Sequence, residues 1–451
     1  MNNVSKIEEV NNELKETFSN SFCLAKWLQA SIYLHRGETH SCYHPPPHKI
    51  PVDTLTNPAA LHNTPLKIQE RRLMLDNLRP PGCQYCWNIE DLKGEHLSDR
   101  KIKSTGLYNK IKVQEIHDNP VSNSINPTRL EISFSDECNF KCGYCHPKHS
   151  SSYYNEIKKY GPIETVTTHQ CYLDFEKVEE NNNPYVDAFW RWWPELSNDL
   201  TVLRITGGEP LLHASTMRLL QELETNPKPN LELSINSNLG MSTRHVEKVS
   251  KQIKILLDKR CIKSFVMYTS MDTWGERAEY IRTGLDCSLW EKNQDTYIRI
   301  TKQPVSHMCT FNILSVTSFK TYLEKVLYWR EKYIDVIDYN GINNLKEENI
   351  RIDIPYLKEP LQYNMLLLPK QEYIKYFNEL VDFAKINLTE IEFEKIKRLR
   401  DYFYQSDIAN IDEGRKNFYN WFVELDQRRN TNFIRTFPEM ESFWKQCQTL
   451  L

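Results

Sequence analysis

Long apolar runs are missing from this sequence of 451 residues, which has nothing close to the roughly 18 apolar residues of a membrane-spanning helix. Residues 1–10 are too polar for a signal peptide. Neither sign of charge is in excess, because 57 Lys and Arg stand against 60 Asp and Glu, for a net charge of −3. That balance gives no general electrostatic reason to bind nucleic acid or an anionic membrane surface. We therefore expect a cytoplasmic protein, with neither a membrane nor nucleic acid as its default partner.

Internal repeats and low-complexity segments are also missing. A hydrophobic content of 40% and a charged content of 26% fit a chain of about two or three globular domains. Twelve cysteines in a chain without an export signal indicate metal binding rather than disulfides, because cytosolic reductants keep thiols free. We expect a short arm, a cysteine-bearing module, an α/β catalytic domain and a helical extension, over residues 1–18, 19–124, 125–360 and 361–451.

Three cysteines stand close together at Cys138, Cys142 and Cys145, with three and then two residues between them. A [4Fe-4S] cube normally takes four thiolates, so three leave one iron open to a small chelating molecule. We expect that open iron to be the reactive centre. A zinc knuckle or a chance cluster of cysteines is the alternative that the triad alone leaves open.

A strand and a glycine turn follow the triad about sixty residues later along the chain. Residues 201–206 are β-branched and apolar and predict a buried strand, which runs into Gly207-Gly208-Glu209-Pro210 before a helix from about Ser215. Glycines allow the backbone to come close to a ligand, and proline fixes the exit from the turn. The triad and this turn together are a much more specific signal than either alone.

Together these motifs resemble the radical S-adenosylmethionine (radical SAM) superfamily. The resemblance implies that the open iron holds the amino and carboxylate groups of SAM, and that the Gly-Gly-Glu-Pro turn presents backbone carbonyls and a carboxylate to the methionine ammonium. It also implies a set of SAM contacts on this chain: Tyr144, Gly207, Gly208, Glu209, Asn236, Asn238, Ser270, Asp272, Arg282 and Asn312. In this set Tyr144 and Asn312 lie near the adenine, Asn236 and Asn238 at the ribose or backbone, and Arg282 at the SAM carboxylate.

Each of these assignments has a simpler alternative. Tyr144 is as suitable for anchoring its own loop as for packing on adenine. Ser270 and Asp272 are residue types that cap helices. Arg282 is suited to a carboxylate because its guanidinium forms a fork, but a surface ion pair uses the same chemistry.

The module at residues 19–124 carries four further cysteines, Cys23, Cys42, Cys83 and Cys86. Gly37 predicts a hairpin that returns Cys42 beside Cys23. The pattern resembles the twitch and SPASM accessory domains of radical SAM enzymes, with too few cysteines for the two clusters of a full SPASM domain. The resemblance implies one auxiliary [4Fe-4S] cluster on these four thiolates, and a structural zinc site is the alternative. In the relatives this module usually follows the barrel, whereas here it comes first.

Strands and helices alternate through the catalytic domain, as expected for right-handed βαβ units. The predicted strands are residues 129–135, 201–206, 231–236, 263–270, 305–312 and 350–354. We therefore predict an α/β fold, a partial (β/α)6 radical SAM barrel with an N-terminal twitch-like iron–sulfur module and a helical C-terminal tail. Reactive groups are expected at the carboxyl ends of the strands, where the first strand delivers the cysteine loop.

Several features have no assigned chemistry. The aromatic run at residues 189–193 is interpreted as core, although part of the insertion that contains it could cover the active site. The stretches 426–430 and 437–441 resemble the ends of twitch-containing radical SAM proteins, and no mechanism follows from them. The remaining cysteines are interpreted as buried filler more readily than as hydrogen donors: Cys171, Cys261, Cys287, Cys309 and Cys447.

The function implied is an oxidoreductase or transferase that cleaves SAM reductively to a 5′-deoxyadenosyl radical, which abstracts hydrogen from a substrate. A reductant such as flavodoxin or ferredoxin would supply the electron. The expected substrate is a peptide or protein, although the chain shows no peptide-binding winged helix. A small molecule such as a cofactor precursor, nucleoside or sugar is the second hypothesis. A third is a non-enzymatic binding protein stabilised by zinc or an iron–sulfur cluster. No residue identifies the bond that is attacked.

Overall fold

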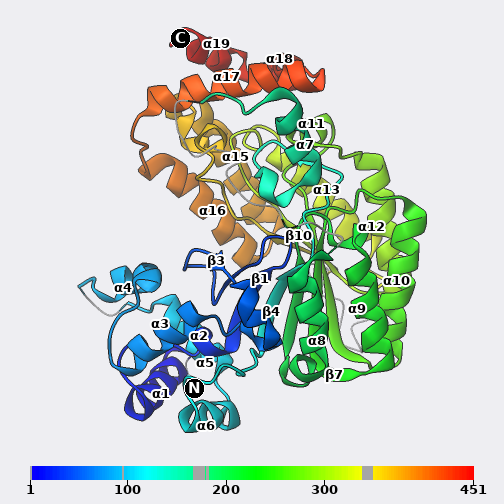
Figure 1. The fold of residues 1–451 in the computed structure, drawn as a ribbon. Helices are drawn as coiled ribbons and strands as arrows, with labels where there is room; N and C mark the ends of the chain where they lie inside the picture. The colour runs from blue at the N-terminus through cyan, green and yellow to red at the C-terminus, as the bar shows by residue number, and fades with distance from the viewer. Residues whose placement is uncertain (1–2, 94–95, 166–177, 179–181, 338–348) are drawn as a thin grey trace.

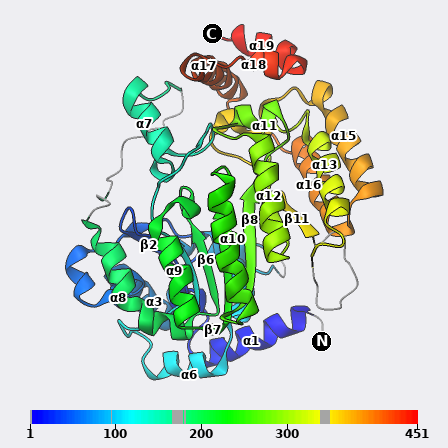
Figure 2. The same cartoon turned by 90° about the vertical axis from the view of Figure 1, so that its right-hand side faces the viewer.

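The computed structural model describes residues 3–93, 96–165, 178, 182–337 and 349–451. Among these residues one mixed sheet runs through the molecule, with the strand order β11-β10-β8-β7-β6-β4-β1-β2-β3. Helices cover it, and α8, α9, α10 and α12 lie side by side over the face that Figure 2 presents. This arrangement confirms the predicted α/β fold class. Among the described residues no helix combines the length and the apolarity needed to cross a bilayer.

Six parallel strands form the predicted barrel segment, and each overlaps a range predicted from the sequence. They are β4 (Arg129–Ser133), β6 (Val202–Thr206), β7 (Lys228–Ser237), β8 (Ile262–Ser270), β10 (Val305–Met308) and β11 (Ile350–Asp353). The carboxyl ends of parallel strands meet at one edge, so the loops after β4, β6, β7 and β8 converge there.

The helices of this region are amphipathic and bury one side against the sheet. They are α8 (Pro184–Asp199), α9 (Ala214–Thr225), α10 (Thr243–Asp258), α12 (Cys287–Thr301) and α13 (Phe319–Lys332). In α10, Val246, Val249 and Ile253 recur at helical spacing and are buried, and Ser242 caps the first turn. In α8, Phe189 and Trp192 are buried, which confirms the interpretation of this aromatic run as core.

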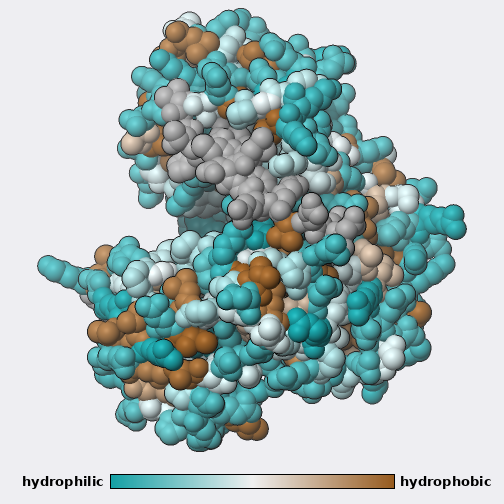
Figure 3. All heavy atoms as spheres, viewed as in Figure 1, coloured by the Kyte–Doolittle hydropathy of each residue, from teal (hydrophilic) through white to brown (hydrophobic). Residues whose placement is uncertain are grey.

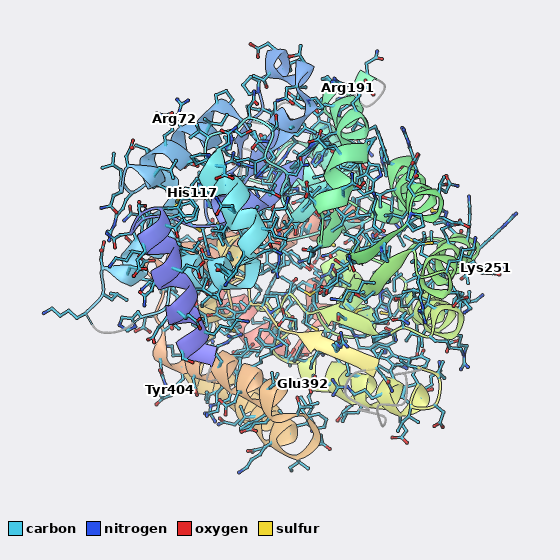
Figure 4. The ribbon with its side chains drawn as sticks, turned by 90° about the horizontal axis from the view of Figure 1, so that it is seen from below. Arg72, His117, Arg191, Lys251, Glu392 and Tyr404 are labelled. Carbon is cyan, nitrogen blue, oxygen red and sulfur yellow. The ribbon has the colours of Figure 1, made fainter. Side chains whose placement is uncertain are left out.

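The N-terminal module has its own small hydrophobic core, around Phe22, Trp27 and Trp87. Its elements are α1 (Asn3–Thr17), α2 (Ala25–Leu28), β1 (Gln29–Tyr33), β2 (Glu38–His40), β3 (His48–Lys49), α3 (Pro65–Leu75), α4 (Gln84–Glu90), α5 (Asp99–Leu107) and α6 (Lys110–Asp118). Helix α1 is docked on this core, because Val10 and Leu14 are buried. Figure 4 shows α1 near the α6 helix that carries His117.

The hairpin of the module is built into the same sheet as the barrel segment. Strand β1 pairs in parallel with β4 along its whole length, from Gln29 opposite Arg129 to Tyr33 opposite Ser133. The reversal into β2 is at Gly37, whose φ of +61° is in the left-handed region that favours glycine. The barrel segment therefore continues without a break into strands supplied by the module.

The C-terminal region is helical, as predicted, and comprises α15 (Lys370–Asn387), α16 (Glu390–Gln405), α17 (Ile411–Arg429), α18 (Phe433–Thr436) and α19 (Glu441–Gln448). A buried ion pair joins it to the sheet: Arg330 of α13 lies 2.5 Å from Glu392 of α16 and also donates to the carbonyl of Ile350 in β11. Glu392 is labelled in Figure 4, which shows the molecule from below. The face in Figure 3 is hollowed between the C-terminal helices above and the N-terminal module below.

Candidate metal and cofactor site

The three-cysteine loop follows the carboxyl end of β4, at the edge of the sheet where the loops after the parallel strands converge. Cys138, Cys142 and Cys145 are half-buried, and each has a raised pKa because burial disfavours the thiolate. Negative charge on Cys142 further raises the pKa of both Cys138 and Cys145, so the three thiols are close enough to interact. Metal ions bind thiolates, so loading this loop would release protons.

A short strand pair fixes the middle of this loop. Strand β5 (Lys141–Cys142) pairs with β9 (Arg282–Thr283), which places Cys142 directly opposite Arg282. The next residue, Gly143, donates its amide to the carbonyl of Ile281 at 3.1 Å. A side chain at Gly143 would bring its Cβ 1.9 Å from the hydroxyl of Tyr363, so a larger residue there would have to displace this buried tyrosine. The loop is therefore held by backbone pairing on one side and by a buried tyrosine on the other.

The Gly-Gly-Glu-Pro turn packs against the cysteine loop. A Cβ on Gly207, whose φ is +134°, would lie 2.6 Å from the carbonyl oxygen of Ser135. A Cβ on Gly208 would lie 2.3 Å from the carbonyl oxygen of Glu137. The amide of Glu209 donates to that same carbonyl at 2.6 Å. The glycines thus permit a close approach between two loops of the protein itself.

The carboxylate of Glu209 is engaged inside the protein. It accepts from the amide of Asn238 at 2.5 Å, the amide of Leu211 at 3.0 Å and the hydroxyl of Ser237 at 2.9 Å. The residue is 1% exposed, and burial raises its pKa to about 7. Three donors of the chain therefore occupy the carboxylate that the resemblance assigns to an ammonium group.

Asn238 connects this turn to the triad. Its side-chain amide lies 3.9 Å from the sulfur of Cys138 and donates to the side chain of Asn139 at 2.8 Å. Asn236, two residues earlier on β7, instead accepts from the Nε of Arg204 at 2.9 Å. Of the two asparagines, Asn238 is the one in contact with a cysteine of the triad.

Arg282, Asp272 and Tyr144 form one buried network beside Cys142. The carboxylate of Asp272 lies 2.8 Å from Nη2 of Arg282 and accepts from the hydroxyl of Tyr144 at 2.7 Å. The other amino nitrogen of Arg282 lies 3.7 Å from the sulfur of Cys142. Asp272 is fully buried and Arg282 is 6% exposed, so theirs is not a surface ion pair. Asp272 does not cap the next helix (Glu276–Ile281) either, because Gly275 is at its N-cap position. Burial alone would lower the pKa of Arg282, but Asp272 raises it and keeps the guanidinium charged.

Ser270 and Asn312 lie at neighbouring strand ends. Ser270 closes β8, half-buried, in register with Met308 of β10. Asn312 is fully buried, and its side-chain amide donates to the carbonyl of Thr310 while its side-chain oxygen accepts from the amide of Leu314. The polar groups of Asn312 are thus used within its own loop.

The four cysteines of the N-terminal module line one small cavity. Cys23 precedes α2, Cys42 follows β2, Cys83 ends a 3-10 turn (Pro81–Cys83), and Cys86 is in α4. Burial raises the pKa of Cys86 to about 11, with smaller contributions from negative charge on Cys23 and Cys42. A buried ion pair adjoins the cavity, where Lys26 lies 2.6 Å from Glu70.

The two groups of cysteines lie at opposite ends of the same strands. Strand β2 runs antiparallel to β1, with His40 opposite Ser31, so the chain returns Cys42 toward the start of β1, near Cys23. Cys138 instead follows the carboxyl end of β4, which is parallel to β1. The five residues of β1 separate the two ends by roughly 16 Å. The module therefore does not bring its cysteines to the loop edge of the sheet.

The chemistry of the triad suits an iron–sulfur cluster with SAM bound to it. Three thiols share one half-buried loop, and a guanidinium and an amide point at two of the sulfurs, as donors do around cluster ligands. The Nε of Arg282 is buried and has no hydrogen-bond partner among the described residues, so one donor is available to a ligand such as a carboxylate. Within the same residues no three Cys, His, Asp or Glu side chains are arranged to hold a single bare metal ion.

Comparison with known proteins supports the radical SAM resemblance. No family model matches the chain. The GTP 3′,8-cyclase of Hydrogenovibrio crunogenus is 24% identical over 165 residues, 36% of this chain and 41% of the cyclase. The GTP 3′,8-cyclase of Acidothermus cellulolyticus is 31% identical over 128 residues, 28% of this chain and 30% of the cyclase. The chain thus spans less than half of these relatives.

Solved structures give a weaker likeness. Native anSMEcpe with bound AdoMet superposes with a TM-score of 0.34 at 18% identity, over 64% of this chain and 65% of that chain. The same protein with AdoMet and a peptide gives a TM-score of 0.33 at 16% identity. Superposition at this level assigns no residue, so the roles proposed below come from the contacts of this chain.

Sequence reasoning missed three charged residues beside the triad. Lys141 lies 2.5 Å from Glu156 of α7 (Ser151–Tyr160), and Glu156 in turn lies 2.8 Å from Arg429. No local pattern marks these residues, although Arg429 is within the C-terminal stretch 426–430 that the sequence singled out. Of the other cysteines, Cys261, Cys287, Cys309 and Cys447 are buried, and Cys171 lies outside the described residues.

Proposed function

We propose that this protein is a radical SAM enzyme whose first cluster is held by Cys138, Cys142 and Cys145. The observation that supports this most is the junction of the triad with the glycine turn, where the amide of Glu209 bonds to the cysteine loop at the loop edge of a parallel sheet. When bound, a [4Fe-4S] cluster supplies an electron that cleaves SAM to methionine and a 5′-deoxyadenosyl radical, which abstracts hydrogen from the substrate. Flavodoxin or ferredoxin as the source of that electron stays a prediction.

The side chains of this site would act by binding and orienting. Arg282 neutralises negative charge near Cys142 and offers its Nε to the SAM carboxylate, while Asp272 keeps the guanidinium in place. Asn238 donates toward Cys138. Because the carboxylate of Glu209 is already engaged, we assign the methionine ammonium to backbone carbonyls of the turn. The proposed SAM contacts remain Tyr144, Gly207, Gly208, Glu209, Asn236, Asn238, Ser270, Asp272, Arg282 and Asn312.

The test is reductive cleavage of SAM. Anaerobically purified protein, reduced with dithionite and given SAM, is expected to release 5′-deoxyadenosine, measured by liquid chromatography and mass spectrometry. Cys142→Ala should abolish the product, whereas Arg191→Gln, an exposed residue of α8 labelled in Figure 4, should leave it unchanged. Release of no 5′-deoxyadenosine by protein with an intact first cluster would overturn the proposal. It would favour the non-enzymatic binding protein.

We further propose that the N-terminal module is twitch-like and holds one auxiliary [4Fe-4S] cluster on Cys23, Cys42, Cys83 and Cys86. The shared cavity supports this set of ligands. Since the cavity is at the end of β1 away from the loop edge, the auxiliary cluster would pass or accept electrons rather than bind the substrate. Zinc on the same four thiolates is the alternative, and metal and sulfide analysis distinguishes the two.

Two substrate classes follow from different observations. Peptide or protein modification is the prediction drawn from the resemblance to twitch and SPASM enzymes. A nucleotide or another small molecule is favoured by the relatives that match in sequence, which are named GTP 3′,8-cyclases. Incubation with SAM and reductant, first with GTP and then with peptides encoded beside the gene, separates the classes by which one acquires a mass change.

A further inference from the structure

The C-terminal stretch 426–430 includes the end of helix α17 and contacts β9 and the segment before it, next to the cysteine loop. Arg429 lies 2.8 Å from Glu156, although 273 residues separate them in the sequence. Their side chains are 3% and 2% exposed, so the pair is shielded from water. A buried charge of this kind has to be paired, and removing one partner of such a pair is much more destabilising than breaking a surface ion pair.

Arg429 reaches both strands of the pair that carries Cys142. Its Nη1 donates to the hydroxyl of Thr283 in β9 at 3.1 Å. Through Glu156 it is joined to Lys141 in β5, at 2.5 Å from the carboxylate. Lys141 and Thr283 are themselves opposite each other in the β5–β9 register. Arg429 and Glu156 therefore link the side chains of Lys141 and Thr283, which belong to the two strands of the short pair next to Cys142.

A second residue of the same stretch holds the segment that leads into β9. The carboxylate of Asp426 accepts from the hydroxyl of Tyr280 at 2.9 Å, two residues before Arg282. It also accepts from the amide of Phe433 and the hydroxyl of Thr431, so the end of α17 is fixed to the turn that follows it. Earlier in the same helix, the indole nitrogen of Trp421 donates to the hydroxyl of Tyr363, which packs against Gly143.

We infer that Arg429 is a positioning residue for the first cluster, which keeps Cys142 facing Cys138 and Cys145 by holding β5 against β9. The strand pair has only two residues on each side, too few to maintain its register alone. The inference rests on the proposed function only in that the three thiols hold a cluster.

The neighbouring residue Arg428 provides a matched control. It is on the same helix and its side chain is 4% exposed, so its replacement removes a similarly buried charge. Its partners are Glu424, on its own helix, and the carbonyl of Gly161, and neither is part of the β5–β9 pair. Both substitutions therefore remove a similarly buried charge. Only Arg429→Gln also removes contacts with the β5–β9 strand pair.

The experiment compares iron retention in these variants of the full chain. Iron and sulfide are measured per chain after anaerobic reconstitution and gel filtration, together with the electron paramagnetic resonance spectrum of the reduced protein before and after SAM is added. We expect Arg429→Gln to bind the first cluster ~10–100-fold more weakly and to lose the SAM-dependent change of the spectrum, as for partners of metal ligands. Arg428→Gln should keep both, and Arg429→Lys should restore part of the iron.

Folding is checked separately by circular dichroism and thermal unfolding, and Glu156→Gln serves as a second variant from the opposite side of the pair. The same loss of iron in Glu156→Gln, with a folded chain, supports the inference. The inference is overturned if both Arg429→Gln and Arg428→Gln keep the wild-type iron content. It is also overturned if both variants lose iron to the same extent. A wild-type protein that retains the first cluster but makes no 5′-deoxyadenosine would contradict the proposed function and leave this inference standing.

Discussion

The guanidinium of Arg282 bridges the carboxylate of Asp272, at 2.8 Å, and the sulfur of Cys142, at 3.7 Å. Asp272 follows the end of β8 and Arg282 begins β9, so this contact joins a barrel strand to the cysteine loop. It also places a permanent positive charge beside a ligand of the proposed cluster. In such a position a cation raises the reduction potential of the cluster, because the reduced form carries more negative charge.

Asp272→Asn should destabilise the protein strongly, because it leaves Arg282 buried without a counter-charge. The expected loss is about 3–5 kcal/mol in the free energy of unfolding, as for other broken buried pairs. Asp258→Asn, which removes an exposed partner of Lys254 on α10, should cost less than about 0.5 kcal/mol. Anaerobic urea unfolding, followed by tryptophan fluorescence, measures both. Equal midpoints for the two variants would show that the buried pair does not stabilise the fold.

Gly208→Ala should displace the cysteine loop. The new Cβ would lie 2.3 Å from the carbonyl oxygen of Glu137 and 2.5 Å from that of Asp136, and neither backbone atom can give way cheaply. We expect a loss of about 1–3 kcal/mol in stability, as for overpacked cores, together with reduced iron at the first site.

Gly106→Ala is the control for this change. Gly106 is in helix α5, and the nearest atom to its added Cβ is 4.0 Å away. Alanine there should stabilise the helix by about 0.5–1 kcal/mol. Normal iron content in a stable Gly208→Ala protein would contradict the proposed packing of turn against loop.

Buried neutral histidines predict sensitivity to acid. His307 is fully buried between Tyr322 and Gln294, and burial lowers its pKa to about 3. Below the unfolded pKa of about 6.5 the unfolded chain gains a proton that the native state does not, so stability falls as the pH falls from 6.5 toward 3. The slope from one such histidine is up to about 1.4 kcal/mol per pH unit.

His307→Gln should remove this slope. The free energy of unfolding is measured between pH 5.5 and 7 for the wild type, for His307→Gln and for His117→Gln, where His117 is exposed on α6. Of the two variants, only His307→Gln is expected to reduce the slope of the free energy of unfolding against pH, by the amount that one bound proton contributes. A wild-type slope in His307→Gln would show that this histidine is already charged in the folded protein.

The four-cysteine cavity should hold its metal independently of the triad. Two cubes predict about eight irons per chain in the wild type. Cys83→Ser should lower this to about four and leave the release of 5′-deoxyadenosine detectable, because the cavity is away from the loop edge. Cys138→Ser should also leave about four irons but abolish that product. Zinc in place of half of the iron in the wild type would identify the module as a zinc site.

Much of the fold could be predicted because its signals are local. Alternation and β-branched residues located the strands of the barrel segment, and Gly37 located the hairpin. Strand β10 ends at Met308, earlier than predicted, because the chain then leaves the sheet and Phe311 pairs with Tyr356. Strand β7 is longer than predicted, because Lys228 already pairs with Ile262.

The remaining features depend on contacts between distant parts of the chain. Nothing in residues 29–33 indicates which edge they join, since pairing with β4 depends on a free edge a hundred residues away. The pairing of Arg429 with Glu156 likewise has no local signature. The internal hydrogen bonds of Glu209 escaped prediction for a related reason: the glycine turn predicts a close approach but not the group that approaches.

Strand β1 covers the entire hydrogen-bonding edge of β4. A chain shortened to begin near residue 125 would leave five backbone rungs of β4 open to any passing strand, a known cause of aggregation. The N-terminal module thus completes the parallel sheet as well as carrying four cysteines. Because the β1–β2 hairpin lies between Cys23 and Cys42, the integrity of the parallel sheet depends on the correct folding of the N-terminal module.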